Sequence, residues 1–592
     1  MMDNNNHNGV YFAPPEKNNE KSKEKVDLSL YAPVKKEHKP FEKKDTVFVF
    51  LTLIAAFLMV DFAAFHGFNI GFSIAYYALF GVTTAYLWRK GAAKNVFSLL
   101  CGGLSLAGAA TFALFDNMLM NALMFFLVAG LYCFYVIGIS DAFKRPRGSF
   151  KALFDVFESV VGDTFGGLER VFGSAKATSR KNKKVINALI GIGIAIPFLI
   201  VIIPLLVQSD AAFEGLIKRI AADIGIYLVE FALALAITPF LFSYFFSKRS
   251  AKRAAAAPKD NTRVLSPTIS VSFLSVISLT YLVYLFSQLA YFFSAFKGIL
   301  PADYHYTASA FARRGFYEMF VICVINILLV SAVGIMTKRI HGRVAPSIKV
   351  LSAFVTLFSV LLIVVAMQKM RLNISIYGLS VNRVLVTTLM VMLLVTIAFF
   401  LLHIFAPKVP YLQPVILICS AMFVALSFAN IDARCADYNI KAYQSGKLET
   451  VDTVAIRKFS DSAVPYLIDL AGSDDKVAAN SARNQIALYI CENENLKLKR
   501  NTKDVRIEYD IKDFRRYNRA RNTAYEMVKQ YYGAASKAEY DQMNRLVVLY
   551  RDGYYDEEEN CFIEFTDEEY SIKHSYNSKT GLYDKTEKTK EW

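Results

Sequence analysis

Long apolar stretches alternate with short polar ones along the first 431 residues of this 592-residue chain. A helix needs about 20 mostly apolar residues to cross a lipid bilayer. We predict transmembrane spans at residues 46–65, 71–88, 96–115, 118–139, 185–207, 224–246, 267–293, 315–336, 349–367, 384–405 and 414–431. The pattern therefore indicates an all-α polytopic membrane protein with about 11 transmembrane helices over residues 46–431.

Two short signals place the ends of particular spans. Asp116 and Asn117 alone separate the third span from the fourth, which predicts a tight helical hairpin. Ser266 precedes Pro267, and a serine N-cap followed by a proline in the first turn is a common helix start. We expect the seventh span to begin at this pair.

The polar ends of the chain differ from each other. Residues 1–45 are rich in Asn, Lys and Glu and predict a disordered cytoplasmic tail. Residues 432–592 are long enough for a small α+β domain, with helices expected at 463–472, 476–492 and 513–532. Short strands are expected at 546–550, 561–565 and 570–575.

Residues 149–173 form an amphipathic segment between the fourth and fifth spans. Phenylalanines and other apolar residues recur there at helical spacing, and a basic run follows through Lys184. One interpretation is a helix that lies on anionic lipid at the cytoplasmic surface, with residues 149–184 as the contact. The other is a helix that docks against the cytoplasmic ends of the protein's own spans.

Composition and charge agree with this class of protein. Hydrophobic residues make up 54% of the chain, above the 45–50% of soluble domains, and the lipid bilayer is the expected partner. The formal charge is +16, but the basic residues cluster in short loops at 89–94, 144–184, 248–253 and 338–349. No nucleic-acid recognition motif accompanies them, so we expect no nucleic-acid partner.

The same clusters predict an orientation. Cytoplasmic loops carry an excess of Lys and Arg, so the clusters predict a protein of the cell membrane whose N-terminus lies in the cytoplasm. With 11 spans, the C-terminal domain is then extracytoplasmic. A bridge between Cys491 and Cys561 stays open in that location, although no cysteine pair has C-x-x-C spacing.

Charged residues near the outer ends of the spans are the candidate site. Asp61, Glu230 and Glu318 lie in separate spans at a similar predicted depth, and charges in lipid are costly unless paired or hydrated. Four arginines lie at the same level: Arg313, Arg314, Arg371 and Arg383. These residues either line an outward-facing cavity that binds an ion, a lipid headgroup or a small polar solute, or form interhelical ion pairs that fix the packing.

Other chemistry is weakly indicated. Asn326 lies near the middle of its span, where an interhelical hydrogen bond is the simplest role. The chain has no P-loop, H-E-x-x-H or G-x-S-x-G motif, so we predict no catalytic residue, metal site or cofactor.

Three groups of residues resemble a known family. They are A-R-R-G-F-Y-E at 312–318 with Asn326; M-R-L at 370–372 with Y-G-L-S at 377–380 and Arg383; and N-I-D-A-R at 430–434 with A-D-Y-N-I at 436–440, Gly446-Lys447 and S-D-S-A-V-P at 460–465. Their order resembles an uncharacterised family of bacterial multi-pass membrane proteins, a domain of unknown function, over roughly residues 50–470. The resemblance implies a bacterial membrane and supplies no activity, ligand or site residue.

Besides a membrane enzyme, which the absence of an enzyme motif makes the third choice, two functions are compatible with these features. One is an integral membrane protein that binds or transports a solute at the outward-facing polar cluster. The alternative is a sensory or envelope-assembly protein that binds an envelope protein through residues 432–592. Transport is the weaker form of the first, because the spans show no pair of matching halves.

Overall fold

The computed structural model describes most of the chain and leaves its N-terminal 40 residues and several connecting segments aside. The described residues are 41–88, 95–143, 151–172, 174, 211–250, 263–297, 316–340, 343–407, 409–493, 496–500, 505–509, 514–556, 558–565 and 570–590.

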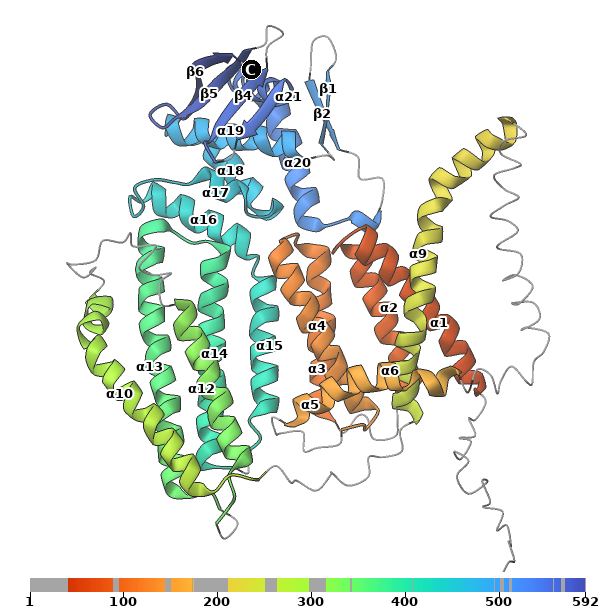
Figure 1. The fold of residues 1–592 in the computed structure, drawn as a ribbon. Coiled ribbons are helices and arrows are strands. Elements are labelled where there is room, and N and C mark those ends of the chain that lie inside the picture. Colours follow the sequence, from red (N-terminus) through yellow and green to blue (C-terminus); the bar gives the residue numbers. More distant parts are fainter. Residues whose placement is uncertain are drawn as a thin grey trace, which may run out of the picture.

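Two helical bundles stand side by side beneath a mixed domain (Figure 1). The first bundle contains α1 (Lys43–Met59), η2 (Val60–Phe65), α2 (Ile70–Leu87), α3 (Val96–Leu114), α4 (Met118–Ile139) and α9 (Ala211–Ser250). The second contains α10 (Pro267–Lys297), α12 (Phe316–Met336), α13 (Pro346–Tyr377), α14 (Val381–Phe405) and α15 (Leu412–Phe428). Helix α15 joins them, because it packs against α3 on one side and α14 on the other.

The bundles have the helices of a polytopic membrane protein. Nine described helices are long and apolar enough to span a membrane, or ten if α15 and α16 (Ile431–Gln444), which meet at 61°, count as one broken span. Ten of the eleven predicted spans fall on described helices, and the span at 185–207 lies outside the described residues. The predicted hairpin at Asp116–Asn117 and the helix start at Pro267 are confirmed.

Small residues bring α3 and α4 into close contact. A methyl group on Gly102 would lie 2.6 Å from the ring of Tyr135, and one on Gly108 would lie 2.8 Å from the sulfur of Met124. Between helices in lipid, association depends on close packing of this kind, because lipid chains are as apolar as the side chains. The hairpin is therefore tightly packed along its length.

A hydrogen-bond network links three helices of the second bundle. The hydroxyl of Tyr281 donates to Oδ1 of Asn326 at 2.6 Å, and Nδ2 of Asn326 donates to Oγ of Ser359 at 2.9 Å. These residues belong to α10, α12 and α13 respectively. The predicted interhelical role of Asn326 is confirmed.

The amphipathic segment forms α5 (Lys151–Glu158), the π-helical turn η4 (Ser159–Asp163) and α6 (Thr164–Gly166). One face docks on α9, where Lys248 Nζ lies 2.6 Å from Asp163 Oδ2. Phe157, Phe165 and Phe172 are exposed. The segment thus contacts the protein's own helix, as one of the two interpretations expected, and also leaves a row of phenylalanines uncovered.

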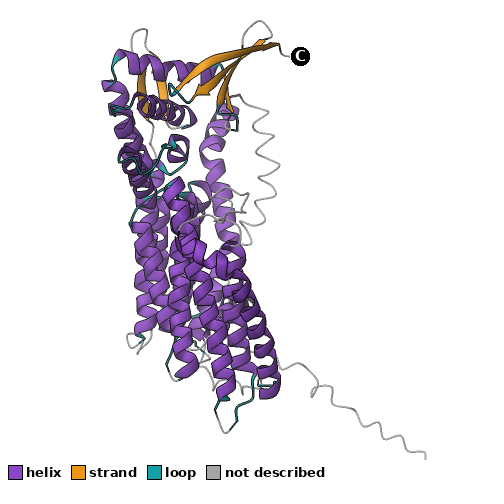
Figure 2. Cartoon of the chain, turned by 90° about the vertical axis from the view of Figure 1, so that its left-hand side faces the viewer, coloured by secondary structure: helices purple, strands orange, loops and turns teal. Residues whose placement is uncertain are grey.

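The C-terminal domain begins with helices and ends with a sheet. Its helices are α16, α17 (Thr453–Arg457), η5 (Asp461–Ala463), α18 (Val464–Ala471), α19 (Lys476–Glu492), η6 (Phe514–Arg516), α20 (Arg519–Ala534) and α21 (Lys537–Arg551). The strands are β1 (Leu496–Arg500), β2 (Val505–Tyr509), β3 (Gly553–Asp556), β4 (Cys561–Phe565), β5 (Tyr570–Asn577) and β6 (Leu582–Lys590). They lie beyond the long helices (Figure 2), as a β1–β2 hairpin and an antiparallel sheet in the order β3-β4-β5-β6.

Two expectations for this domain need correction. Residues 546–550 are helical rather than a strand, because the capping box of Ser536 and Glu539 starts α21 and Met543, Leu546 and Leu549 are buried at helical spacing. The local run of branched and aromatic residues favoured a strand, but the packing of these side chains against the domain core stabilises a helix instead. Cys491 and Cys561 are both free thiols, so the bridge left open is not formed.

Candidate functional site

A basic pocket lies at the end of the second bundle that is remote from the C-terminal domain. We call this end of the molecule the far end and the other the domain end. The pocket has a volume of about 460 Å³ and lies among α12, α13 and α14. Its polar lining is Ser331, Arg339, Arg343, Lys349, Ser352, His403 and Tyr411, and its apolar lining includes Val330, Ile335, Ile348, Phe400 and Ile404.

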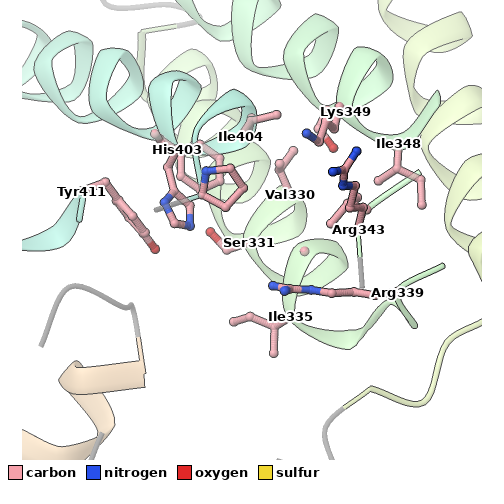
Figure 3. A pocket seen from close by; sticks show the side chains of 15 residues that line it. Val330, Ser331, Ile335, Arg339, Arg343, Ile348, Lys349, His403, Ile404 and Tyr411 are labelled. Carbon is pink, nitrogen blue, oxygen red and sulfur yellow. The ribbon is translucent and has the colours of Figure 1, made fainter. Parts of the chain in front are cut away.

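Backbone hydrogen bonds hold the connection that carries the two arginines. Lys338 N donates to Leu265 O at 2.9 Å, which ties the residues after α12 to those before α10. Ile340 and Arg343 exchange two backbone hydrogen bonds of 2.9 Å each. Pro346 then opens α13. The guanidinium groups of Arg339 and Arg343 consequently project over the pocket from a braced turn (Figure 3).

The pocket carries positive charge without an acidic counterpart. Arg339, Arg343 and Lys349 form no ion pair with any residue that the structure describes, and no Asp or Glu lines the pocket. The hydroxyl of Ser331 is buried and has no hydrogen-bond partner among the described residues. A cavity with unpaired cations and an unsatisfied donor is suited to an anion, because both features favour a negatively charged acceptor.

His403 and Tyr411 form the wall opposite the arginines in Figure 3. Nδ1 of His403 lies 3.0 Å from the carbonyl of Val409, and the His403 ring lies 4.6 Å from that of Tyr411. The contact to a carbonyl means that Nδ1 carries a hydrogen, so a neutral imidazole would have its acceptor at Nε2. Protonation of Nε2 would add a further donor to this wall.

Asp61 and Glu230, two of the predicted site residues, lie together at the domain end of the first bundle. Asp61 lies in η2 and accepts hydrogen bonds from Nη1 of Arg515 at 2.9 and 3.1 Å. Nδ1 of His66 lies 3.2 Å from Oδ1 of Asp61. Glu230 lies within electrostatic range of Asp61, His66 and Arg515. We call these four residues the buried charge cluster.

The other predicted site residues lie elsewhere. Glu318 and Arg371 are exposed on α12 and α13 of the second bundle, and Arg313 and Arg314 lie outside the described residues. Arg383 donates to the carbonyls of Tyr377 and Gly378, at 3.1 and 2.7 Å. The described residues of the set are therefore not gathered in one cavity.

A second polar cluster joins the α3–α4 turn to the C-terminal domain. The backbone N–H of Asp461 donates to Asp116 Oδ2 at 3.2 Å, and Arg521 Nε donates to Asp461 Oδ2 at 3.1 Å. Burial, together with the neighbouring Asp461 carboxylate, raises the pKa of Asp116 well above its usual range. Beside it, Asn117 Nδ2 donates to both carboxylate oxygens of Asp432, at 2.9 and 3.0 Å.

The sequence analysis did not identify several of these residues as site residues. The cations of the basic pocket were interpreted only as orienting charges, although three of them bracket one short connection between spans. Arg515 carries no local signal, because its partner Asp61 is 454 residues away.

Comparisons with known proteins give one match. The model of a family described as Domain of unknown function (DUF4153) matches residues 102–470, more than half of the chain. Neither a curated protein nor a solved structure matches the chain.

Proposed function

Because the chain belongs to the DUF4153 family, whose description assigns no activity, we propose a function from the geometry of the basic pocket: this integral membrane protein binds a phosphate-bearing anion there, presented by a phospholipid headgroup. The observation that carries the proposal is the group of three cations that line one cavity and have no acidic partner among the described residues. Basic pockets between membrane helices are a recognised setting for anionic headgroups.

The apolar wall supports a lipid over a free ion. Phe400, Ile404 and Ile348 line the same space as the cations, so an acyl chain would find apolar surface beside the headgroup site. A free phosphate ion would leave that surface without a partner. The phosphate group is common to both ligands, and the experiment below separates them.

The orientation of the pocket is part of the proposal. The far end carries Lys248, Arg249, Lys338 and the pocket cations, and an excess of such residues supports a cytoplasmic location. The C-terminal domain is then extracytoplasmic. The exposed phenylalanines of α5 and α6 belong to the same end, where they support contact with the cytoplasmic leaflet.

We expect a cysteine introduced at Lys579, in the exposed turn between β5 and β6, to react with a membrane-impermeant maleimide in intact spheroplasts. A cysteine at Lys338, exposed at the far end, should react only after permeabilisation. The opposite labelling pattern would contradict the orientation.

The charge of the pocket is tested by the double variant Arg339→Gln/Arg343→Gln. Each charge-assisted hydrogen bond contributes about 1.5–3 kcal/mol, so we expect the affinity for phosphatidylglycerol to fall at least tenfold. The measurement is lipid retention by native mass spectrometry of the full-length protein, taken from nanodiscs that contain phosphatidylcholine and phosphatidylglycerol.

The matched control is Arg263→Gln/Lys338→Gln, which removes two exposed cations at the same end without touching the pocket lining. Equal phosphatidylglycerol retention in the two double variants would refute the pocket as the site. Short-chain phosphatidylglycerol should compete for binding, whereas inorganic phosphate at the same concentration should not. Competition by phosphate alone would assign the pocket to the free ion.

A further inference from the structure

Glu230 is a buried carboxylate without a hydrogen-bond partner. Its exposed fraction is 0%, and among the described residues neither carboxylate oxygen accepts a hydrogen bond. An ionised carboxylate in such a place is costly, because it has lost the solvation that water provides and gained no donor in return. Glu230 lies at the domain end of the first bundle, whereas the basic pocket lies at the far end of the second. The proposal below does not rest on that pocket.

The charges around Glu230 can be counted. The carboxylate of Asp61 is matched by the guanidinium of Arg515, which donates two hydrogen bonds to it. Among the described residues that act on Glu230, His66 is the one that can supply a second positive charge. The cluster is therefore neutral in two arrangements, with a proton on Glu230 beside a neutral His66, or with an ionised Glu230 beside a protonated His66.

Charged groups on the other elements packed against α9 lie away from Glu230. At the far end, Arg249 of α9 pairs with Glu42 and Asp45, and Lys248 pairs with Asp163 of η4. Helix α2 has no charged side chain. In the described part of the chain, the groups that face Glu230 are accordingly Asp61 from η2, His66 from the turn after it, and Arg515 from η6.

We propose that the buried charge cluster is a proton-binding site, in which Glu230 and His66 share one exchangeable proton and Arg515 of the C-terminal domain closes the site. Glu230 and His66 form no direct hydrogen bond, so the proton passes between the carboxyl and the imidazole through water, which converts one neutral arrangement into the other without changing the total charge. Release of the proton to water from either residue leaves the cluster with one net negative charge.

Other features of the site fit a proton as the ligand. No group of three or more His, Cys, Asp and Glu side chains in the described part of the chain is arranged to hold a metal ion. Asp61 lies in a π-helical turn, a departure from α-helix that is frequent at functional sites. Ionisable residues buried within membrane helices often form proton relays.

The test is infrared spectroscopy of the full-length protein in nanodiscs over a pH titration. The wild type should show carboxylic acid C=O absorption that is lost as the pH rises, and Glu230→Gln should lack one component of it, while the component that Asp116 contributes stays. The matched control is Glu318→Gln, a carboxylate in the first turn of another span that is exposed, and it should retain the component that Glu230→Gln lacks. Carboxylic acid absorption in Glu230→Gln that equals the wild-type absorption over the whole pH range would overturn the proposal.

A second variant keeps the proposal open to test if Glu230→Gln does not fold. Arg515→Gln removes the charge that matches Asp61, so the two carboxyls must share the remaining positive charge. The protonated carboxyl band should then increase about twofold at the same pH, while Arg516→Gln, an exposed neighbour, should leave it unchanged. An unchanged or weaker band in Arg515→Gln would also overturn the proposal.

Discussion

Replacement of Arg521 by methionine is expected to destabilise the part of the C-terminal domain that contacts the first bundle by about 3 kcal/mol. Arg521 donates to Asp461, whose backbone N–H in turn contacts Asp116 in the α3–α4 turn. Loss of one partner from a buried ion pair costs about 3–5 kcal/mol, because the other charge stays buried and unpaired. We expect the lower end of this range, since the Arg521 side chain is 28% exposed.

Hydrogen exchange of the α20 backbone amides in the full-length protein measures this effect. Arg519→Met is the matched control, because Arg519 lies on the same helix and is exposed. Exchange that is equally fast in both variants would show that Arg521 does not stabilise α20 in this part of the C-terminal domain.

The pH dependence of the same junction gives an independent check. The attached form binds a proton at Asp116 more tightly than the detached form, because the pKa of Asp116 is raised by burial and by Asp461. The attachment should therefore be strongest at acidic pH and weaken as the pH rises through the raised pKa. Asp116→Asn cannot ionise, so its thermal unfolding midpoint should lose this slope. A slope identical to that of the wild type would contradict the assignment.

Replacement of Gly378 by alanine is expected to destabilise the protein by about 3 kcal/mol. Gly378 has a φ of +74°, and a methyl group there would collide with Oδ1 of Asn439. Asn439 accepts from Leu379 N at 2.7 Å and donates to Leu379 O at 2.8 Å, so the collision would disturb both hydrogen bonds. With a ψ of −170°, Gly378 has a backbone conformation that is almost exclusive to glycine and costs alanine at least about 1 kcal/mol, and each hydrogen bond contributes about 1 kcal/mol.

Gly446→Ala is the control variant, because it carries the cost of a positive φ for alanine without a collision with a neighbouring atom. Gly446 has a φ of +70°, and no atom lies within 4 Å of the position that a methyl group would take. Thermal unfolding in detergent should show a loss for Gly378→Ala that is about 2 kcal/mol larger than for Gly446→Ala. Equal losses would mean that the contact with Asn439 does not stabilise the fold.

The sequence was most informative where one physical requirement acts locally. Lipid demands about 20 apolar residues for each span, so the spans could be predicted from hydropathy alone. Asn326 could be interpreted in the same way, because an amide in the middle of a span needs a partner on a neighbouring helix.

Long-range partners could not be predicted. Arg515 belongs to no pattern that points to Asp61 of η2, and Asp461 belongs to none that points to Asp116 of the α3–α4 turn. The second and third family-like groups of residues also meet only in three dimensions, where Asn439 bonds Leu379. Their role in the structure is to join the second bundle to the C-terminal domain.

The hydrogen bonds between Asn117 and Asp432 constrain how many times the chain crosses the membrane. The two residues touch, so they lie on the same side, and an even number of crossings must separate them in the sequence. Seven helices of the described chain lie between them as candidate spans when α15 is included, which is an odd number. The predicted span at 185–207, outside the described residues, would make the number even. The span at 185–207 stays a prediction, and any topology map of the chain must give an even number of crossings between Asn117 and Asp432.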